Sequence, residues 1–354
     1  MSVEISYKKQ GLLFFIFVII ILGVVEIGAR VYESQKLSCN FIGKDAFNQV
    51  DEVLQNQVCN DTRDIAYTEP DILRFVPNQN YETININSHG FRGGEISDKQ
   101  NEVFRIILVG GSTTFGAGAT SDDNTIPGQL QELFNKKQYN VEVINAGINS
   151  GYSYTEKILI EKDLISLEPN LLILYTGGND SHRPIIYPTA KVGDIGINFK
   201  DVRFWRTPFV ISDIIIDTTR YEKTNLEIDK NFVSEKISFW KKNMNDICMI
   251  ANEKNIMTVV TIHPILATSE KIFSDDEHSF MNNDDFQTTR TVLEIHEGIS
   301  GELKELDSIC DNTYDLRKSF KGISEPIFFD EVHVNDKGNG IIANKLFEII
   351  EPYI

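Results

Sequence analysis

Short apolar runs alternate with longer amphipathic stretches along most of this chain, and that alternation limits the folds open to it. The apolar runs are VFRIILV (103–109), VEVIN (141–145), LLILY (171–175) and IMTVVTIH (256–263). The stretches with apolar residues at three-to-four spacing are 126–137, 153–167, 233–254 and 289–309. Strands buried on both faces and alternating with helices are typical of a parallel sheet between two helical layers. We therefore expect an α/β fold with right-handed crossovers.

One stretch near the amino terminus is apolar for long enough to cross a bilayer. Residues 11–29 (GLLFFIFVIIILGVVEIGA) carry one charge, Glu26, and a helix of that length covers about 28 Å. A cleaved signal peptide is the alternative, although its apolar core is normally about 7–15 residues long and VEIGAR is a poor cleavage site. A buried core helix would carry a polar face, which is absent here. Lys8 and Lys9 favour a cytoplasmic tail over residues 1–10, with the rest of the chain periplasmic or extracellular.

Charge and cysteine content restrict the partners and the compartment. The chain has 354 residues, 52 acidic and 34 basic, for a formal net charge of −18. Nucleic acid is not expected as a partner, because phosphate binding needs clustered Lys and Arg. The four cysteines, Cys39, Cys59, Cys248 and Cys310, allow three pairings, and a Cys39–Cys59 bond would suit an oxidising compartment. Cys248 lies on the apolar face of 233–254 and is expected to be a core residue.

The length suits one large domain with appendages. Residues 30–100 contain turn signals and no long periodic element, so we expect a linker and wrapping segment there. The main domain is expected over 101–354. Residues 181–232, which include Trp205, form an insertion that could be a lid, an acyl-chain wall or a contact with the membrane.

Polar clusters follow the apolar runs at the points where the strands should end. Ser112 comes directly after the first run, NAGINSGYS (145–153) follows the second and TGGND (176–180) follows the third. FFDEVHVNDKG (328–338) precedes a last helix with an apolar side. Ligands of parallel sheets bind at the carboxyl ends of the strands, so we expect these loops to converge.

Three familiar glycine-rich sites do not fit. GSTTFGAG has Ala117 and Gly118 where a P-loop requires Lys and Ser or Thr. No dinucleotide-binding fingerprint follows a strand. The nucleophile elbow of α/β-hydrolases needs Gly two residues after the serine, and that position is Thr114.

The same clusters contain the parts of a serine esterase. A serine hydroxyl needs a base and the base needs an orienting partner, and His333 with Asp330 could supply both to Ser112. The tetrahedral oxyanion needs N–H donors. The candidates are the backbone N–H of Ser112, the backbone N–H of Gly151 and the side-chain amide of Asn179. Gly147 in the same loop is an alternative to Gly151.

On these residues the chain resembles the SGNH (GDSL-type) hydrolase superfamily, whose blocks supply Ser, Gly, Asn and His in this order. The resemblance covers about 103–350 and implies a three-layer αβα sandwich with a flavodoxin-like parallel sheet. It matches Ser112 to the nucleophile, Gly151 and Asn179 to the oxyanion donors, and Asp330 with His333 to the DxxH block. The first block reads Gly-Gly-Ser-Thr here in place of Gly-Asp-Ser-Leu.

The resulting hypothesis is a membrane-anchored serine ester hydrolase of esterase, lipase or O-deacetylase type. Its substrate would be an ester-bearing small molecule, a lipid or an acylated glycan, and the mechanism needs no cofactor or metal. The alternatives are an acyl (O-acetyl) transferase on a cell-surface glycan and a non-catalytic binding module of an envelope assembly. Of the remaining histidines, His263 would border the pocket, His182 could contact substrate, and His278 is expected in a solvated acidic loop.

Overall fold

A five-stranded parallel sheet forms the centre of the computed structural model, which describes residues 6–36, 39–68, 71–99, 102–182, 207, 229–281 and 286–354. In chain order the strands are β5 (Phe104–Gly110), β6 (Val141–Gly147), β7 (Leu171–Thr176), β8 (Met257–Ile262) and β9 (Asn312–Asp315). They lie in the spatial order β6-β5-β7-β8-β9, which is the flavodoxin-like order. The expected α/β class and sheet topology are confirmed.

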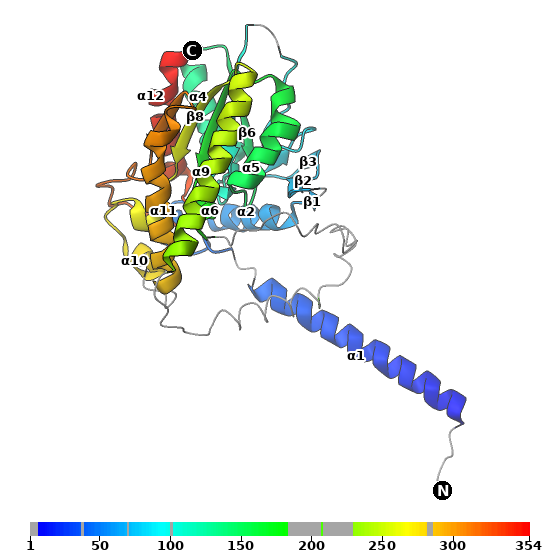
Figure 1. Ribbon diagram of the computed structural model, residues 1–354. Helices are drawn as coiled ribbons and strands as arrows, with labels where there is room; N and C mark the ends of the chain where they lie inside the picture. The colour runs from blue at the N-terminus through cyan, green and yellow to red at the C-terminus, as the bar shows by residue number, and fades with distance from the viewer. Residues whose placement is uncertain are drawn as a thin grey trace. The chain divides into compact units, whose positions relative to one another are not determined.

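Helices cover both faces of the sheet (Figure 1). One layer holds α5 (Ser153–Leu159), α9 (Lys230–Glu253) and α11 (Phe286–Leu306), and the other holds α4 (Ile126–Lys136) and α12 (Asp336–Ile350). Neighbouring residues of a strand point to opposite faces, so Ile107 and Val109 of β5 pack in the first layer while Ile106 and Leu108 pack in the second. The strands are therefore buried on both sides, as their apolar composition predicts.

Local sequence signals explain where several helices begin. The side chain of Thr125 accepts the Gly128 N–H at the start of α4, and Asn335 accepts the Gly338 N–H at the start of α12. The stretch expected as one helix over 153–167 is divided: α5 continues into a π-helical turn, Ile160–Leu164, and a 3-10 turn, Ile165–Leu167.

Residues 40–99 belong to the same compact unit as the sheet. They contain α2 (Glu52–Asp64) and two small antiparallel pairs, β1 (Tyr67–Thr68) with β2 (Arg74–Phe75) and β3 (Gln79–Asn80) with β4 (Asn85–Ile86). The sequence shows no periodic element at α2 because its buried face includes Gln55 and Asp61 beside Val58 and Cys59. A helix that buries polar side chains lacks the apolar stripe by which helices are recognised.

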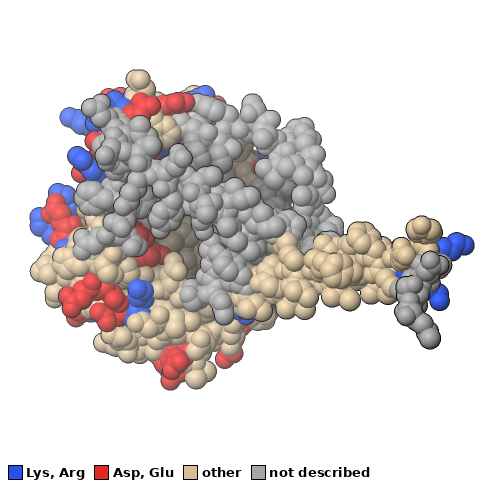
Figure 2. Space-filling view, turned by 90° about the horizontal axis from the view of Figure 1, so that it is seen from below, with Lys and Arg blue, Asp and Glu red and all other residues tan. Residues whose placement is uncertain are grey.

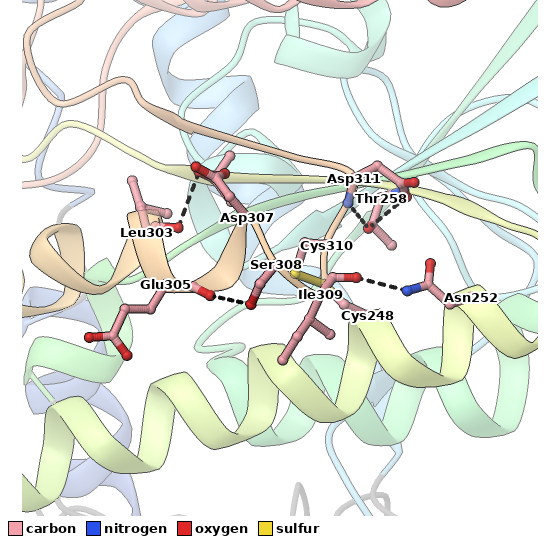
Figure 3. The surroundings of a disulfide bond; sticks show 11 residues. Cys248, Asn252, Thr258, Leu303, Glu305, Asp307, Ser308, Ile309, Cys310 and Asp311 are labelled. Atoms are coloured by element: carbon pink, nitrogen blue, oxygen red, sulfur yellow. Dashed lines mark hydrogen bonds between the residues drawn. A yellow bond between two sulfur atoms is a disulfide. The ribbon is translucent and has the colours of Figure 1, made fainter.

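A disulfide joins Cys248 of α9 to Cys310, which follows α11 (Figure 3). Cys248 is buried in the core, as predicted, and its pairing settles one bond that the sequence left open. Beside it, the Asn252 side-chain amide donates to the Ile309 carbonyl over 2.7 Å. Cys39 and Cys59 are also disulfide-bonded.

The amino terminus forms a single long helix, α1 (Tyr7–Lys36). Within its segment Tyr7–Val31, the most apolar 18 residues have a mean hydropathy of 2.9, and the segment is long and apolar enough to cross a membrane, a test that a signal sequence also passes. In Figure 2 its surface is free of acidic and basic side chains along most of its length. The proposed lid, residues 181–232, lies almost entirely outside the described residues.

Candidate active site

The candidate nucleophile stands at the carboxyl end of the central strand β5. The chain leaves β5 at Gly110 and enters the four-residue helix α3 (Ser112–Phe115) at Ser112. A Cβ atom on Gly110 would lie 2.5 Å from the Tyr175 carbonyl oxygen, and one on Gly111 would lie 2.6 Å from Asn179 Nδ2. Both positions therefore need glycine, because any side chain would overlap the neighbouring strand or loop.

Ser112, His333 and Asp330 form a continuous chain of hydrogen bonds. Ser112 Oγ lies 2.7 Å from His333 Nε2, and His333 Nδ1 lies 2.8 Å from Asp330 Oδ2. The two partners come from the loop before α12, more than two hundred residues beyond the serine in the chain. Both distances are those of well-formed hydrogen bonds. The structure thus brings together the three side chains that the sequence proposes as a triad.

The charges at His333 and Asp330 stabilise each other. Burial opposes ionisation of Asp330, but the positive charge of His333 and hydrogen bonds from the His333 and Val332 backbones lower its pKa. Burial also disfavours the imidazolium, but the Asp330 carboxylate outweighs it and raises the pKa of His333. The ring of His333 is further fixed by stacking on Phe329, with centroids 5.7 Å apart. An imidazole with raised proton affinity is suited to accept a hydroxyl proton.

A buried ion pair fixes the segment that leads to Asp330 and His333. Glu277 Oε1 accepts the backbone N–H groups of Ile327 and Phe328 at 3.1 and 3.0 Å, and Oε2 lies 2.7 Å from Lys271 Nζ. Both side chains are fully buried. The acidic stretch around His278 was expected to be a solvated loop. Instead it forms α10 (Asp275–Met281), in which His278 is exposed and Glu277 is buried.

The candidate oxyanion donors gather around the serine. The Asn179 side chain, on α6 (Gly178–His182), donates one hydrogen to the Gly151 carbonyl over 2.7 Å and keeps a second hydrogen. The Ser112 N–H is in the first turn of α3, where backbone N–H groups lack intrahelical acceptors.

The two glycine alternatives, Gly147 at the end of β6 and Gly151 in the loop after it, each donate their N–H to a nearby residue. The Gly151 N–H is 2.8 Å from the Ile148 carbonyl, and the Gly147 N–H is 3.0 Å from Asn145 Oδ1. Either N–H would have to leave its acceptor to bind an oxyanion. Ser112 and Asn179 are therefore the donors that the present geometry favours.

A buried acidic pair lies behind Asn179. The Asp180 carboxylate accepts the Ser153 N–H at 3.1 Å, and Ser153 Oγ in turn accepts from Asn243 Nδ2 at 2.9 Å. Burial raises the pKa of Asp180, and burial together with the Asp180 charge raises the pKa of Glu156 well above its usual value. These contacts join the start of α5 to α6. The segment of Gly151 and the segment of Asn179 are therefore held together.

Arg92 supports the nucleophile helix from the segment before β5, and the sequence gives no signal of this role. Its guanidinium is buried, lies 2.7 Å from Asp122 and donates to the carbonyls of Gly116 and Phe115 at 2.8 and 3.2 Å. It also donates to the Thr83 carbonyl at 3.0 Å. Cations at a helix carboxyl terminus stabilise the free carbonyls there.

The remaining expectations concern histidines and metals. His182 is the last residue of α6. His263 follows β8 and contacts Gly178, next to Asn179. In the part of the chain that the structure describes, no group of three or more His, Cys, Asp or Glu side chains could hold a metal ion.

Comparison with known proteins gives likenesses to solved structures alone. No family model and no curated protein matches the sequence. The structural matches include an acetyl xylan esterase at 20% identity, covering 70% of this chain and 99% of that one, with a TM-score of 0.41. A putative lipolytic protein of the G-D-S-L family from Desulfitobacterium hafniense matches at 13% identity, 70% and 99% coverage and a TM-score of 0.41.

A GDSL-like lipase from Bacteroides thetaiotaomicron matches at 12% identity, covering 73% of this chain and 93% of that one, with a TM-score of 0.40. The chain is similar to GDSL-type hydrolases. At these identities and scores the likeness assigns no chemistry, which is inferred instead from the contacts of Ser112, His333 and Asp330.

Proposed function

We propose that this protein is a serine ester hydrolase. The observation that carries the proposal is the unbroken hydrogen-bond chain from Ser112 Oγ through His333 to Asp330. A serine at a strand end serves many structural purposes, but a half-buried carboxylate that orients an imidazole toward its hydroxyl is the arrangement that nucleophilic catalysis requires. A protein that only bound esters would need neither of these two hydrogen bonds.

The reaction would proceed through an acyl-enzyme. His333 Nε2 takes the Ser112 hydroxyl proton as Oγ attacks the ester carbonyl, and the Ser112 N–H and Asn179 amide stabilise the oxyanion. His333 then gives that proton to the leaving alcohol. Water attacks the acyl-enzyme, with His333 again as base, to release the acid and restore the serine. Asp330 stays ionised throughout and stabilises the imidazolium.

We further propose that α1 anchors the protein in a membrane, with the folded unit on the extracytoplasmic side. Two observations support this placement. Tyr7–Val31 has the length and hydropathy of a membrane span. The four cysteines of the chain are all disulfide-bonded, as is usual for proteins outside the reducing cytosol.

Hydrolysis of p-nitrophenyl acetate and of longer-chain p-nitrophenyl esters by the full chain in detergent tests the proposal. Ser112→Ala should abolish turnover without lowering Tm, because a part-exposed hydroxyl contributes little to stability. Ser121→Ala is the matched control. Ser121 lies nearby in the chain and its side chain makes no capping hydrogen bond, so its replacement removes a hydroxyl that has no role in the proposed mechanism. Equal activity in Ser112→Ala and wild type would overturn the proposal, whereas turnover only with an added alcohol acceptor would indicate acyl transfer.

A further inference from the structure

His263 is in direct contact with the start of α6, the short helix that carries Asn179. It follows β8, and its ring nitrogen Nε2 lies 3.0 Å from the backbone nitrogen of Gly178. A Cβ atom on Gly178 would lie 2.2 Å from Nε2, so the imidazole is packed against this backbone with no room for a side chain between them. His263 therefore contacts the backbone of the residue that directly precedes Asn179.

The hydrogen bonds of His263 define which ring nitrogen carries the proton. Gly178 donates its N–H, so Nε2 must be an acceptor. Nδ1 lies 3.0 Å from the Pro264 carbonyl, which can only accept, so Nδ1 carries the hydrogen. His263 is thus neutral in this arrangement. The rings of Tyr175 and His296 face it with centroids 5.2 and 6.0 Å away, and burial raises the pKa of Tyr175, which keeps that neighbour neutral.

We propose that His263 is a positioning residue for ester hydrolysis, acting as the acceptor that orients Gly178 so that the Asn179 side-chain amide faces the developing oxyanion. This inference rests on the proposed function. Contacts at three successive residues then hold the start of α6: His263 accepts from Gly178, Asn179 donates to the Gly151 carbonyl, and Asp180 accepts from Ser153. The role proposed for His263 is exerted through the Gly178 backbone N–H.

Two substitutions separate the acceptor from the bulk of the ring. His263→Leu removes the acceptor and keeps an apolar side chain of similar size. His263→Gln returns an oxygen acceptor on a side chain of similar reach. Thr261→Val is the matched control, because it removes a buried hydrogen bond to the Leu174 carbonyl from the same strand without touching the loop.

For p-nitrophenyl acetate hydrolysis by the full chain, His263→Leu should lower kcat by about tenfold to a hundredfold with little change in KM. That loss is smaller than the roughly 10²–10³ that follows deletion of an oxyanion donor. His263→Gln should recover most of kcat, and Thr261→Val should keep it. A kcat for His263→Leu equal to that of Thr261→Val would overturn the proposal, and so would a His263→Gln variant no better than His263→Leu.

Hydrogen exchange of the segment 176–182, followed by mass spectrometry, provides a test that does not depend on turnover. His263→Leu should speed exchange of this segment, while His263→Gln should not. Unchanged exchange in His263→Leu would refute the contact's role whatever the activity. If wild type has no esterase activity but exchange responds as expected, the proposed function fails while the positioning of the loop stands.

Discussion

Replacing Arg92 by methionine tests whether the segment before β5 stabilises the nucleophile helix. Arg92 is 2% exposed, and its guanidinium donates to Asp122 and to the carbonyls of Thr83, Phe115 and Gly116. Methionine retains the side-chain stem and its packing on the ring of Phe115, whose centroid lies 5.0 Å from Arg92 Cζ. The substitution removes every N–H donor of the guanidinium.

The expected loss in the free energy of unfolding depends on which groups lose their hydrogen-bond partner when Arg92 is replaced. Removing one partner of a buried ion pair costs about 3–5 kcal/mol. The Asp122 carboxylate keeps the Asn85 N–H and side-chain amide as donors and its side chain is 18% exposed, so it is not left as an isolated buried charge. The Phe115 carbonyl keeps the Asn145 amide and the Gly116 carbonyl keeps the Ala119 N–H as donors. The Thr83 carbonyl loses the Arg92 donor, at about 1–3 kcal/mol for an unsatisfied buried group. We therefore expect a decrease of about 1–3 kcal/mol in the free energy of unfolding.

Thermal unfolding of the full chain in detergent, followed by near-ultraviolet circular dichroism, measures the effect. Arg92→Met should lower Tm by roughly 2–12 °C and reduce ester hydrolysis already below the transition. Arg74→Met is the matched control, because Arg74 pairs with Asp71 and Asp163 at a more exposed site and should cost about 0–1 kcal/mol. Equal Tm values for Arg92→Met and Arg74→Met would refute this reasoning.

Two further outcomes concern the triad and the disulfide. Asp330 raises the pKa of His333 above 6.5, the ordinary histidine value. Because protonated His333 cannot act as a base, activity should fall as the pH decreases through this raised pKa. Asp330→Asn should move this limb of the kcat/KM profile to lower pH while lowering kcat, and an unmoved limb would contradict the pairing. Replacing both Cys248 and Cys310 by Ser opens a loop of 62 residues. The free energy of unfolding should therefore decrease by about 4 kcal/mol, which is measured as a lower Tm. An unchanged Tm would contradict this stabilising role of the disulfide.

The sequence predicts the centre of the fold well and its edges poorly, for a physical reason. The runs at 103–109 and 171–175 become β5 and β7 within a residue at each end, because strands buried on both faces must be apolar throughout. β9 at Asn312–Asp315 was not predicted, since it lies at the sheet edge with side chains that are partly or fully exposed. An edge strand needs no apolar run.

The same distinction holds in the site. Ser112 and His333 could be proposed because their chemistry and their positions, after the first strand run and before the last helix, restrict their role. Arg92, Glu277 and His263 act by bonding to backbone groups of distant segments. Such contacts depend on where the chain returns in space, which no local pattern of residue types contains.

Labelling with a fluorophosphonate, followed by mass spectrometry of peptides from the full chain, tests whether Ser112 is an activated nucleophile. The reagent reacts with a serine whose hydroxyl is activated by a base. We expect one labelled serine, Ser112, and no label there in His333→Ala. Labelling at a different serine, or equal labelling of Ser112 without His333, would contradict it.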